Sequence, residues 1–372
     1  MSSRHRSRAV LGGISEHLYV EGGSVPSTTP WFKYHEVCDD VVGNYPRVNP
    51  YYNKQVIKRY DGINGTIHPY GLTVHYKNYV ETFCLLADLG HSTDDLDPFN
   101  LDELATRLWA RTNPSRPVAS VPQFIGELKD LPGLIQTKGR NLADSAGSGY
   151  LAYQFGWVPL IRDLQNFMDA TGIISRRVNE LSRLHSKGGL KRSLKMGLST
   201  STKTTNEVFN SEFFSSSGRS ERKTTQTIWG SIRWIPDHSP PSTDMERRKQ
   251  ARDAVFALHA TPINALSTAW ELLPWSWLVD WSANVGEYLT ARQNVVGAHA
   301  VDACIMRKLV TSRKDMRSGA LPAGLTGGDG GTQTLIEKFR FPVSGPTLTA
   351  TFPVLNGYRL SILSALFAQR SR

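Results

Sequence analysis

The stretch Leu190–Ser201 (LKRSLKMGLSTS) and the stretch Thr224–Ile235 (TTQTIWGSIRWI) both alternate in polarity and are rich in Ser, Thr and β-branched residues. A period of two residues places successive side chains on opposite faces of a β-strand. Between the stretches lies the serine-rich segment Ser215–Gly218, which is typical of a turn. The pattern therefore predicts a long antiparallel hairpin over residues 188–243.

Similar signals occur on both sides of this hairpin. Residues 1–100 and 295–350 contain short β-prone runs separated by turn signals such as Asn64-Gly65. The glycine-rich segment Gly327–Gly331 is predicted to be a β-turn and not a phosphate-binding loop, because neither Lys-Ser/Thr nor a helix follows it. We expect 1–100, 188–243 and 295–350 to form one antiparallel β region.

The remaining segments, 101–187, 244–294 and the C-terminal 351–372, show helical periodicity. Asn100 is a candidate N-cap for a helix that begins at Leu101. In the best periodic segment, apolar residues fall on one side of a helix and basic residues fall within about 120° on the other. The predicted fold class is therefore α+β, an elongated protein with one antiparallel β-sheet region and one α-helical bundle region, each built from discontinuous segments.

Charge favours a polyanionic partner. The 372 residues carry a formal net charge of +10, with −2 in the first hundred residues and +12 in the rest. Two basic clusters are candidate contacts for a phosphate backbone. Their residues are Arg162, Arg176, Arg177, Arg183, Lys187, Lys191, Arg192, Arg247, Arg248, Lys249 and Arg252. The alternative is that these side chains are simply solvated. Arg4, Arg6 and Arg8 form either a basic arm or a plain flexible terminus.

Several classes of protein are not supported. The three cysteines are far apart and lack a CxxC pair, so neither a disulfide framework nor a zinc site is expected. The basic N-terminus lacks the apolar core of a signal peptide, and no run of about 18 apolar residues predicts a membrane span. The common nucleotide, metalloprotease and hydrolase motifs are absent. We therefore expect no enzyme activity, cofactor or metal.

Two windows decide the family. They are YQFGWVPLIRDL at Tyr153–Leu164 and WELLPWSWLVDW at Trp270–Trp281. The aromatic, proline and glycine residues in them suit helix junctions in a core, and the two acids need a basic partner or backbone amides to cap. We expect these residues to be structural: Gln154, Phe155, Gly156, Trp157, Pro159, Trp270, Glu271, Pro274, Trp277, Asp280 and Trp281. In order and spacing the windows resemble the maturation (attachment) proteins of single-stranded RNA bacteriophages, the leviviruses.

The resemblance implies a virion component made and assembled in the host cytoplasm. One copy would replace a coat-protein dimer, bind viral genomic RNA stem-loops, including the 3′ end, through its helical part, and meet the host pilus through its β part. Candidate pilus surfaces are Tyr45–Tyr60 and Phe213–Arg219, although strand tyrosines in a β core are the better explanation of such residues. The alternatives are a cellular RNA-binding protein with a β accessory domain and an enzyme acting on nucleic acid. Some family members also inhibit cell-wall synthesis, and this sequence leaves that point open.

Overall fold

The computed structural model consists of two compact units. Unit 1 comprises Met1–Phe99, Lys195–Gly230 and Cys304–Val343, and unit 2 comprises Asn100–Leu194, Ser231–Ala303 and Ser344–Arg372. The described residues are 2–20, 28–43, 48–80, 89–116, 179–185, 189–210, 213–238, 243, 245–246, 249, 279–280, 283–294, 296–350, 361–362 and 364.

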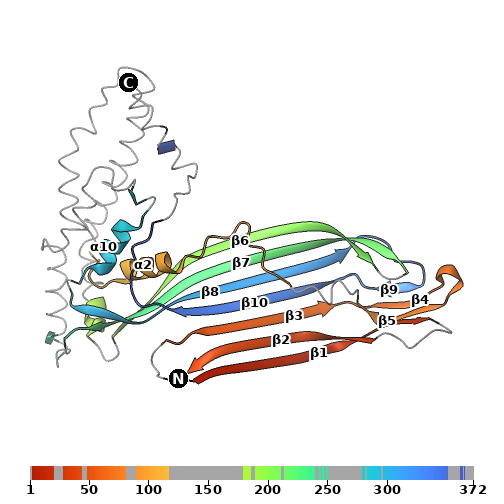
Figure 1. Cartoon of the computed structure of the whole chain (residues 1–372), viewed down its shortest axis with the longest axis horizontal. Helices are drawn as coiled ribbons and strands as arrows, with labels where there is room; N and C mark the ends of the chain where they lie inside the picture. The colour runs from red at the N-terminus through yellow and green to blue at the C-terminus, as the bar shows by residue number, and fades with distance from the viewer. Residues whose placement is uncertain are drawn as a thin grey trace, which may run out of the picture. The chain divides into compact units, whose positions relative to one another are not determined.

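Ten strands form a single sheet (Figure 1). Their bounds are β1 Ser2–Val20, β2 Thr28–Val42, β3 Tyr51–Tyr60, β4 Ile63–Ile67, β5 Val74–Tyr79, β6 Leu190–Asn210, β7 Ser215–Pro236, β8 Ala298–Arg317, β9 Leu325–Gly327 and β10 Gly330–Pro342. The strand order is β6-β7-β8-β10-β3-β2-β1-β5-β4-β9. Every pair with a described register is antiparallel. Strand β10 therefore lies between β3 and β8, although about 280 residues separate β3 from β10.

Strands β6 and β7 cover most of the range of the predicted hairpin and are neighbours in the sheet. From Thr224 to Trp234 in β7 the even-numbered residues, among them Ile228 and Ile232, are buried, while their odd-numbered neighbours are more exposed. This alternation is what the period of two requires. The predicted turn, however, is part of a strand, because β7 already begins at Ser215.

The predicted fold class is wrong. The described residues are mostly strand and form a large antiparallel sheet, with two α-helices and one 3₁₀-helix of described bounds, rather than a helical bundle region beside a sheet. The physical reason is strand length. Strands β1, β6, β7 and β8 each run for 19 to 22 residues, whereas strands of five or six residues are usual. Short β-prone runs in the sequence therefore understate how far each strand extends.

The predicted helix after Asn100 is present as α2, Leu101–Thr112. Asn100 Oδ1 accepts hydrogen bonds from the backbone amides of Asp102 at 3.1 Å and Glu103 at 3.3 Å. These bonds satisfy two amides that have no carbonyl partner within the helix. The second α-helix is α10, Val285–Arg292. Among the described residues, no helix combines the length and hydropathy needed to cross a membrane.

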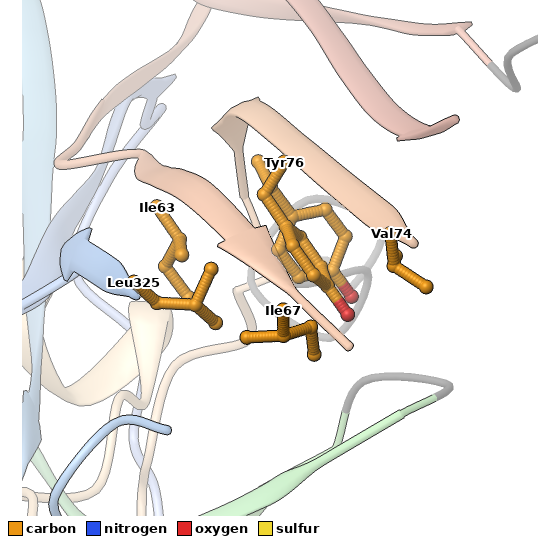
Figure 2. Packing of buried hydrophobic residues seen from close by; sticks show 6 residues of the cluster. Ile63, Ile67, Val74, Tyr76 and Leu325 are labelled. Carbon is orange, nitrogen blue, oxygen red and sulfur yellow. The ribbon is translucent and has the colours of Figure 1, made fainter. Parts of the chain in front are cut away.

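In unit 1, β4, β5 and β9 enclose an apolar cluster (Figure 2). Its buried members are Ile63, Ile67, Val74, Tyr76, Tyr79 and Leu325. The Tyr76 ring meets the rings of Tyr79 and Phe214 edge to face, with centroids 5.2 Å and 5.7 Å away. Such contacts add to the free energy gained by burying the rings, so this cluster fixes the hairpin formed by β4 and β5.

The connection between β4 and β5 is a 3₁₀ turn, η1, Pro69–Gly71, that contains a strained residue. Tyr70 has φ 54° and ψ 29°, and its side chain is 95% exposed. The left-handed conformation costs a residue with a Cβ about 1–2 kcal/mol, and exposure returns little of that energy.

Replacing Tyr70 with glycine is expected to raise the free energy of unfolding by about 0.5–1 kcal/mol, because relief of strain exceeds the entropy cost of glycine. Urea denaturation would measure the change. Leu72→Gly is the matched control, because Leu72 has an ordinary φ of −95° and should be destabilised. The strain argument would be contradicted if Tyr70→Gly did not raise the free energy of unfolding, or if Leu72→Gly raised it by the same amount.

Candidate functional site

Four of the eleven candidate RNA-binding residues lie among the described residues: Arg183, Lys191, Arg192 and Lys249. The others lie outside them: Arg162, Arg176, Arg177, Lys187, Arg247, Arg248 and Arg252. Three of the four described side chains are exposed, and Arg192 is half-buried. The described residues of this predicted set therefore form two groups, with three exposed side chains and one half-buried.

Arg192 is engaged within unit 2. Its guanidinium forms an ion pair with Glu180 and donates a hydrogen bond to the backbone carbonyl of Thr112 at the end of α2. A charge-assisted bond to a helix C-terminus satisfies a carbonyl that the helix leaves open. Arg192 thus joins β6, α2 and the helical residues 179–184, a role that the sequence did not indicate.

Arg183 and Lys191 differ from Arg192 in their surroundings. Residues 179–184 are helical, with Leu181 and Leu184 fully buried and Arg183 exposed. Lys191 is exposed on β6, where it alternates with Arg192. Positive side chains with access to solvent can reach phosphates at little desolvation cost. These two residues and Lys249 are the accessible members of the predicted set.

Of the eleven motif residues predicted to be structural, only Asp280 lies among the described residues. Its Oδ1 accepts a hydrogen bond from the backbone amide of Gly286, near the start of α10, at 3.1 Å. Amide capping is one of the two roles that the sequence suggested for this acid. The other motif residues lie outside the described residues: Gln154, Phe155, Gly156, Trp157, Pro159, Trp270, Glu271, Pro274, Trp277 and Trp281.

In unit 1, one face of the sheet carries a row of largely buried polar side chains. This face is called the covered face. The imidazole of His91, in residues 89–99, lies 2.6 Å from Thr311 Oγ1 and 3.1 Å from Glu337 Oε2. Thr311 also lies 2.8 Å from Thr224 Oγ1. Burial lowers the pKa of His91, although Glu337 opposes that shift. Burial, with a hydrogen bond to Glu337, raises the pKa of Tyr52 to about 12.

The opposite face of unit 1, called the basic face, carries three cross-strand rows. Arg6 pairs with Cys38, Cys38 with Asn53, Asn53 with Lys338 and Lys338 with Lys308. Directly paired residues of antiparallel strands share a face, and so do residues two positions apart. The neighbouring rows begin at Arg4 and Arg8. The charged members of the three rows are Arg4, Arg6, Arg8, Lys308, Lys338, Arg340, Asp40 and Glu36.

The two acids on the basic face are held ionised by their neighbours. Asp40 receives the Nε of Arg4 at 2.9 Å and the Nη2 of Arg6 at 3.2 Å, and the bond from Arg4 lowers the pKa of Asp40. Hydrogen bonds from Tyr34, Gln55 and Asn53 lower the pKa of Glu36 to about 2. With six basic residues against two acids, the face keeps an excess of four positive charges. Because Arg4, Arg6 and Arg8 lie within β1, they belong to an ordered strand and not to a free arm.

The segments suggested as pilus surfaces are partly buried: most of residues 51–60 are half-buried, and Ser215, Ser217 and Arg219 are exposed. Residues 51–60 form β3 inside the sheet, and Phe213 and Phe214 pack against the apolar cluster of β4, β5 and β9. Tyr51, Tyr52 and Tyr60 are strand tyrosines, as the alternative supposed, and a pilus contact by either segment stays a prediction. No group of three potential metal ligands occurs within the part of the chain that the structure describes.

A family model described as phage maturation protein matches residues 125–331, which is more than half of the chain. The chain belongs to this family. The match contains both sequence windows that suggested it, at 153–164 and 270–281. The prediction of a leviviral maturation protein is therefore confirmed. No curated protein sequence matches the chain. Phage maturation proteins are structural and attachment proteins of the virion, not a family of enzymes, and this maturation protein shares that role.

Proposed function

We propose that this maturation protein binds the phage genomic RNA, including its 3′ end, and carries it to the host by attaching the virion to a pilus. One copy replaces a coat-protein dimer of the shell, and assembly takes place in the host cytoplasm. The observation that carries the proposal is the family match over 125–331. This segment contains every candidate RNA-binding residue and both motif windows.

Electrostatics support RNA as the partner of the accessible basic residues. A structured RNA offers phosphates and splayed bases, which lysine and arginine contact through charge, hydrogen bonds and stacking. Arg183, Lys191 and Lys249 are exposed, whereas the guanidinium of Arg192 is already occupied by Glu180 and Thr112. We therefore assign the RNA contacts to the exposed members and to those outside the described residues, and we assign Arg192 a structural role.

The triple variant Arg183→Glu, Lys191→Glu and Lys249→Glu is expected to bind genomic RNA roughly 10- to 100-fold more weakly. Loss of three phosphate contacts should also reduce the slope of log affinity against log salt concentration by about 2. Filter binding of the purified full-length protein at several salt concentrations would measure both quantities.

The matched control carries the same change of charge in unit 1, at three other exposed lysines: Lys33→Glu, Lys77→Glu and Lys203→Glu. If control and test variants lose affinity equally, the effect is only net charge and the assignment is wrong. Crosslinking of RNA to protein in purified virions gives an independent check. Crosslinks should fall in 160–195 and 244–260, and crosslinks concentrated in 1–100 would contradict the proposal.

A further inference from the structure

The basic face is open along β1 and less so across the other strands, where Cys38 and Asn53 are buried and Lys308 and Lys338 are half-buried. The side chains of Arg4 and Arg6 are 47% and 54% exposed, and Arg8 is exposed as well. On the covered face, by contrast, Ile305, Leu309 and Thr311 of β8 are buried, and His91 contacts Thr311. The basic face therefore offers a partner of unit 1 an accessible surface along β1, with half-buried residues of β8 and β10 beside it.

Apolar side chains run through the basic face between the charges. The row that begins at Arg8 continues through Glu36 and Gln55 to Ile336 and Val310, which are half-buried. The next row contains Val10, 40% exposed, with Tyr34 and Ile57. The outer face of a two-faced antiparallel sheet is normally polar. Apolar residues, tyrosine and arginine together are instead typical of the centre of a protein interface.

The carboxylates of Asp40 and Glu36 on this face indicate whether its partner is a nucleic acid or an acidic protein. A nucleic acid backbone presents one negative charge per nucleotide without interruption, so it would meet Asp40 and Glu36 at close range. Its phosphates also gain nothing from Ile336 or Val310. A folded protein can place carboxylates opposite the basic residues and apolar side chains opposite the apolar rows. The arrangement of charges therefore fits an acidic protein surface better than RNA.

We propose that the basic face is the surface through which this maturation protein docks on its host receptor, and that the receptor presents carboxylates around an apolar centre. The inference rests on the proposed attachment function and names the chemistry of its partner. The cationic contacts come from Arg6 and Arg8 on β1 and from Lys308 and Lys338 on β8 and β10. The apolar contacts come from Val10 and Ile336.

The first test uses the purified full-length protein and two labelled probes. One is the random copolymer poly(Glu,Tyr), which is acidic and aromatic, and the other is a 30-nucleotide oligouridylate. The variant Arg6→Gln with Arg8→Gln should bind poly(Glu,Tyr) about tenfold more weakly, and Val10→Ser about two- to threefold more weakly. The control Lys77→Gln with Lys203→Gln removes two exposed charges elsewhere in unit 1 and should have a smaller effect. Circular dichroism would establish that all variants are folded.

Oligouridylate binding decides between partners. We expect the Arg6/Arg8 variant to change it no more than the control does. Equal loss for both probes would assign the face to RNA, and no loss of poly(Glu,Tyr) binding beyond the control would leave the face without a docking role. Either result overturns the inference.

The second test uses virions and separates this inference from the proposed function. Virions that carry the Arg6/Arg8 variant should adsorb less to cells that wild-type virions infect. If virions lacking the protein adsorb normally, the attachment function itself is wrong. If only the variant adsorbs normally, the function stands and the assigned face is wrong. Failure of the variant to enter virions would assign the face to the coat protein and would also overturn the inference.

Discussion

Replacing Arg313 with alanine is expected to lower the free energy of unfolding by about 3–5 kcal/mol. Arg313 Nε lies 2.8 Å from Asp315 Oδ1, and its Nη2 lies 3.0 Å from Glu207 Oε2. The side chains of Arg313 and Asp315 are only 4% and 1% exposed. Removing the guanidinium leaves a buried carboxylate without this partner, and the share of the desolvation energy that the ion pair offset is lost.

Two controls separate the loss of a partner from the loss of a side chain. Arg4→Ala breaks an ion pair whose arginine is 47% exposed, and water replaces the lost contact, so about 1 kcal/mol or less is expected. The double variant Arg313→Met with Asp315→Leu removes both charges and should recover most of the stability lost in the single variant. Urea denaturation of the four proteins gives the comparison. If Arg313→Ala were no less stable than Arg4→Ala, other groups would stabilise the charge of Asp315 in place of Arg313.

Local patterns predicted local structure well. The alternation in Leu190–Ser201 and Thr224–Ile235 predicted β6 and β7, and Asn100 predicted where α2 begins. Both signals act within a few residues, through the pleat of a strand or the open amides of a helix. The turn signal at Asn64-Gly65 misled, because Gly65 lies inside β4, where its φ of 132° accompanies an irregular register with β5. A glycine in a sequence indicates an unusual backbone conformation, but such a conformation occurs both in turns and in β-bulges.

The arrangement of the sheet could not be predicted, because it depends on distant pairing. Strand β10 joins β3 to β8, and no local pattern determines which strands become neighbours. Arg4, Arg6 and Arg8 looked like a basic arm because every residue from Ser2 to Arg8 is polar. In the structure they face Asp40 and Glu36, about 30 residues away. The helical bundle was predicted from local periodicity and cap residues, and from the family resemblance, none of which measures how long the strands elsewhere become.

The sequence predicted which residues of the candidate site are basic, but not which of their side chains are exposed and which are engaged within the fold. Arg183, Lys191 and Arg192 are equivalent in the sequence, since each is a basic residue in a basic segment. Only the fold places Thr112, 80 residues earlier, next to Arg192. Sequence alone therefore could not separate a structural arginine from accessible ones. The same limit applies to Asn113, which no motif indicated and which joins α2 to α10.

Asn113→Ala is expected to destabilise unit 2 by about 2–4 kcal/mol. The side-chain amide nitrogen of Asn113 lies 3.0, 3.3 and 2.8 Å from the backbone oxygens of Thr290, Ala291 and Gln293, at the end of α10. Its Oδ1 accepts the backbone amide of Ser115 at 2.8 Å. One buried side chain thus satisfies carbonyls that α10 leaves open and ties them to the end of α2. Alanine would leave these groups unpaired away from water, which costs more than the bonds contribute.

Asn113→Asp distinguishes donation from packing, because aspartate keeps the shape and the acceptor for Ser115 but faces the three carbonyls with oxygen. If donation matters, this variant should be at least as unstable as Asn113→Ala at pH 7. It should recover as the pH falls, because protonation of the carboxyl restores a donor and removes a buried charge. The exposed Asn294, changed to alanine, provides the reference and should lose about 1 kcal/mol or less. Thermal unfolding between pH 4 and 8 would measure all three variants. If Asn113→Asp matched wild type at pH 7, the carbonyls would have to find other donors, and the connection between α2 and α10 would rest on apolar packing around Leu108 and Ala291 instead.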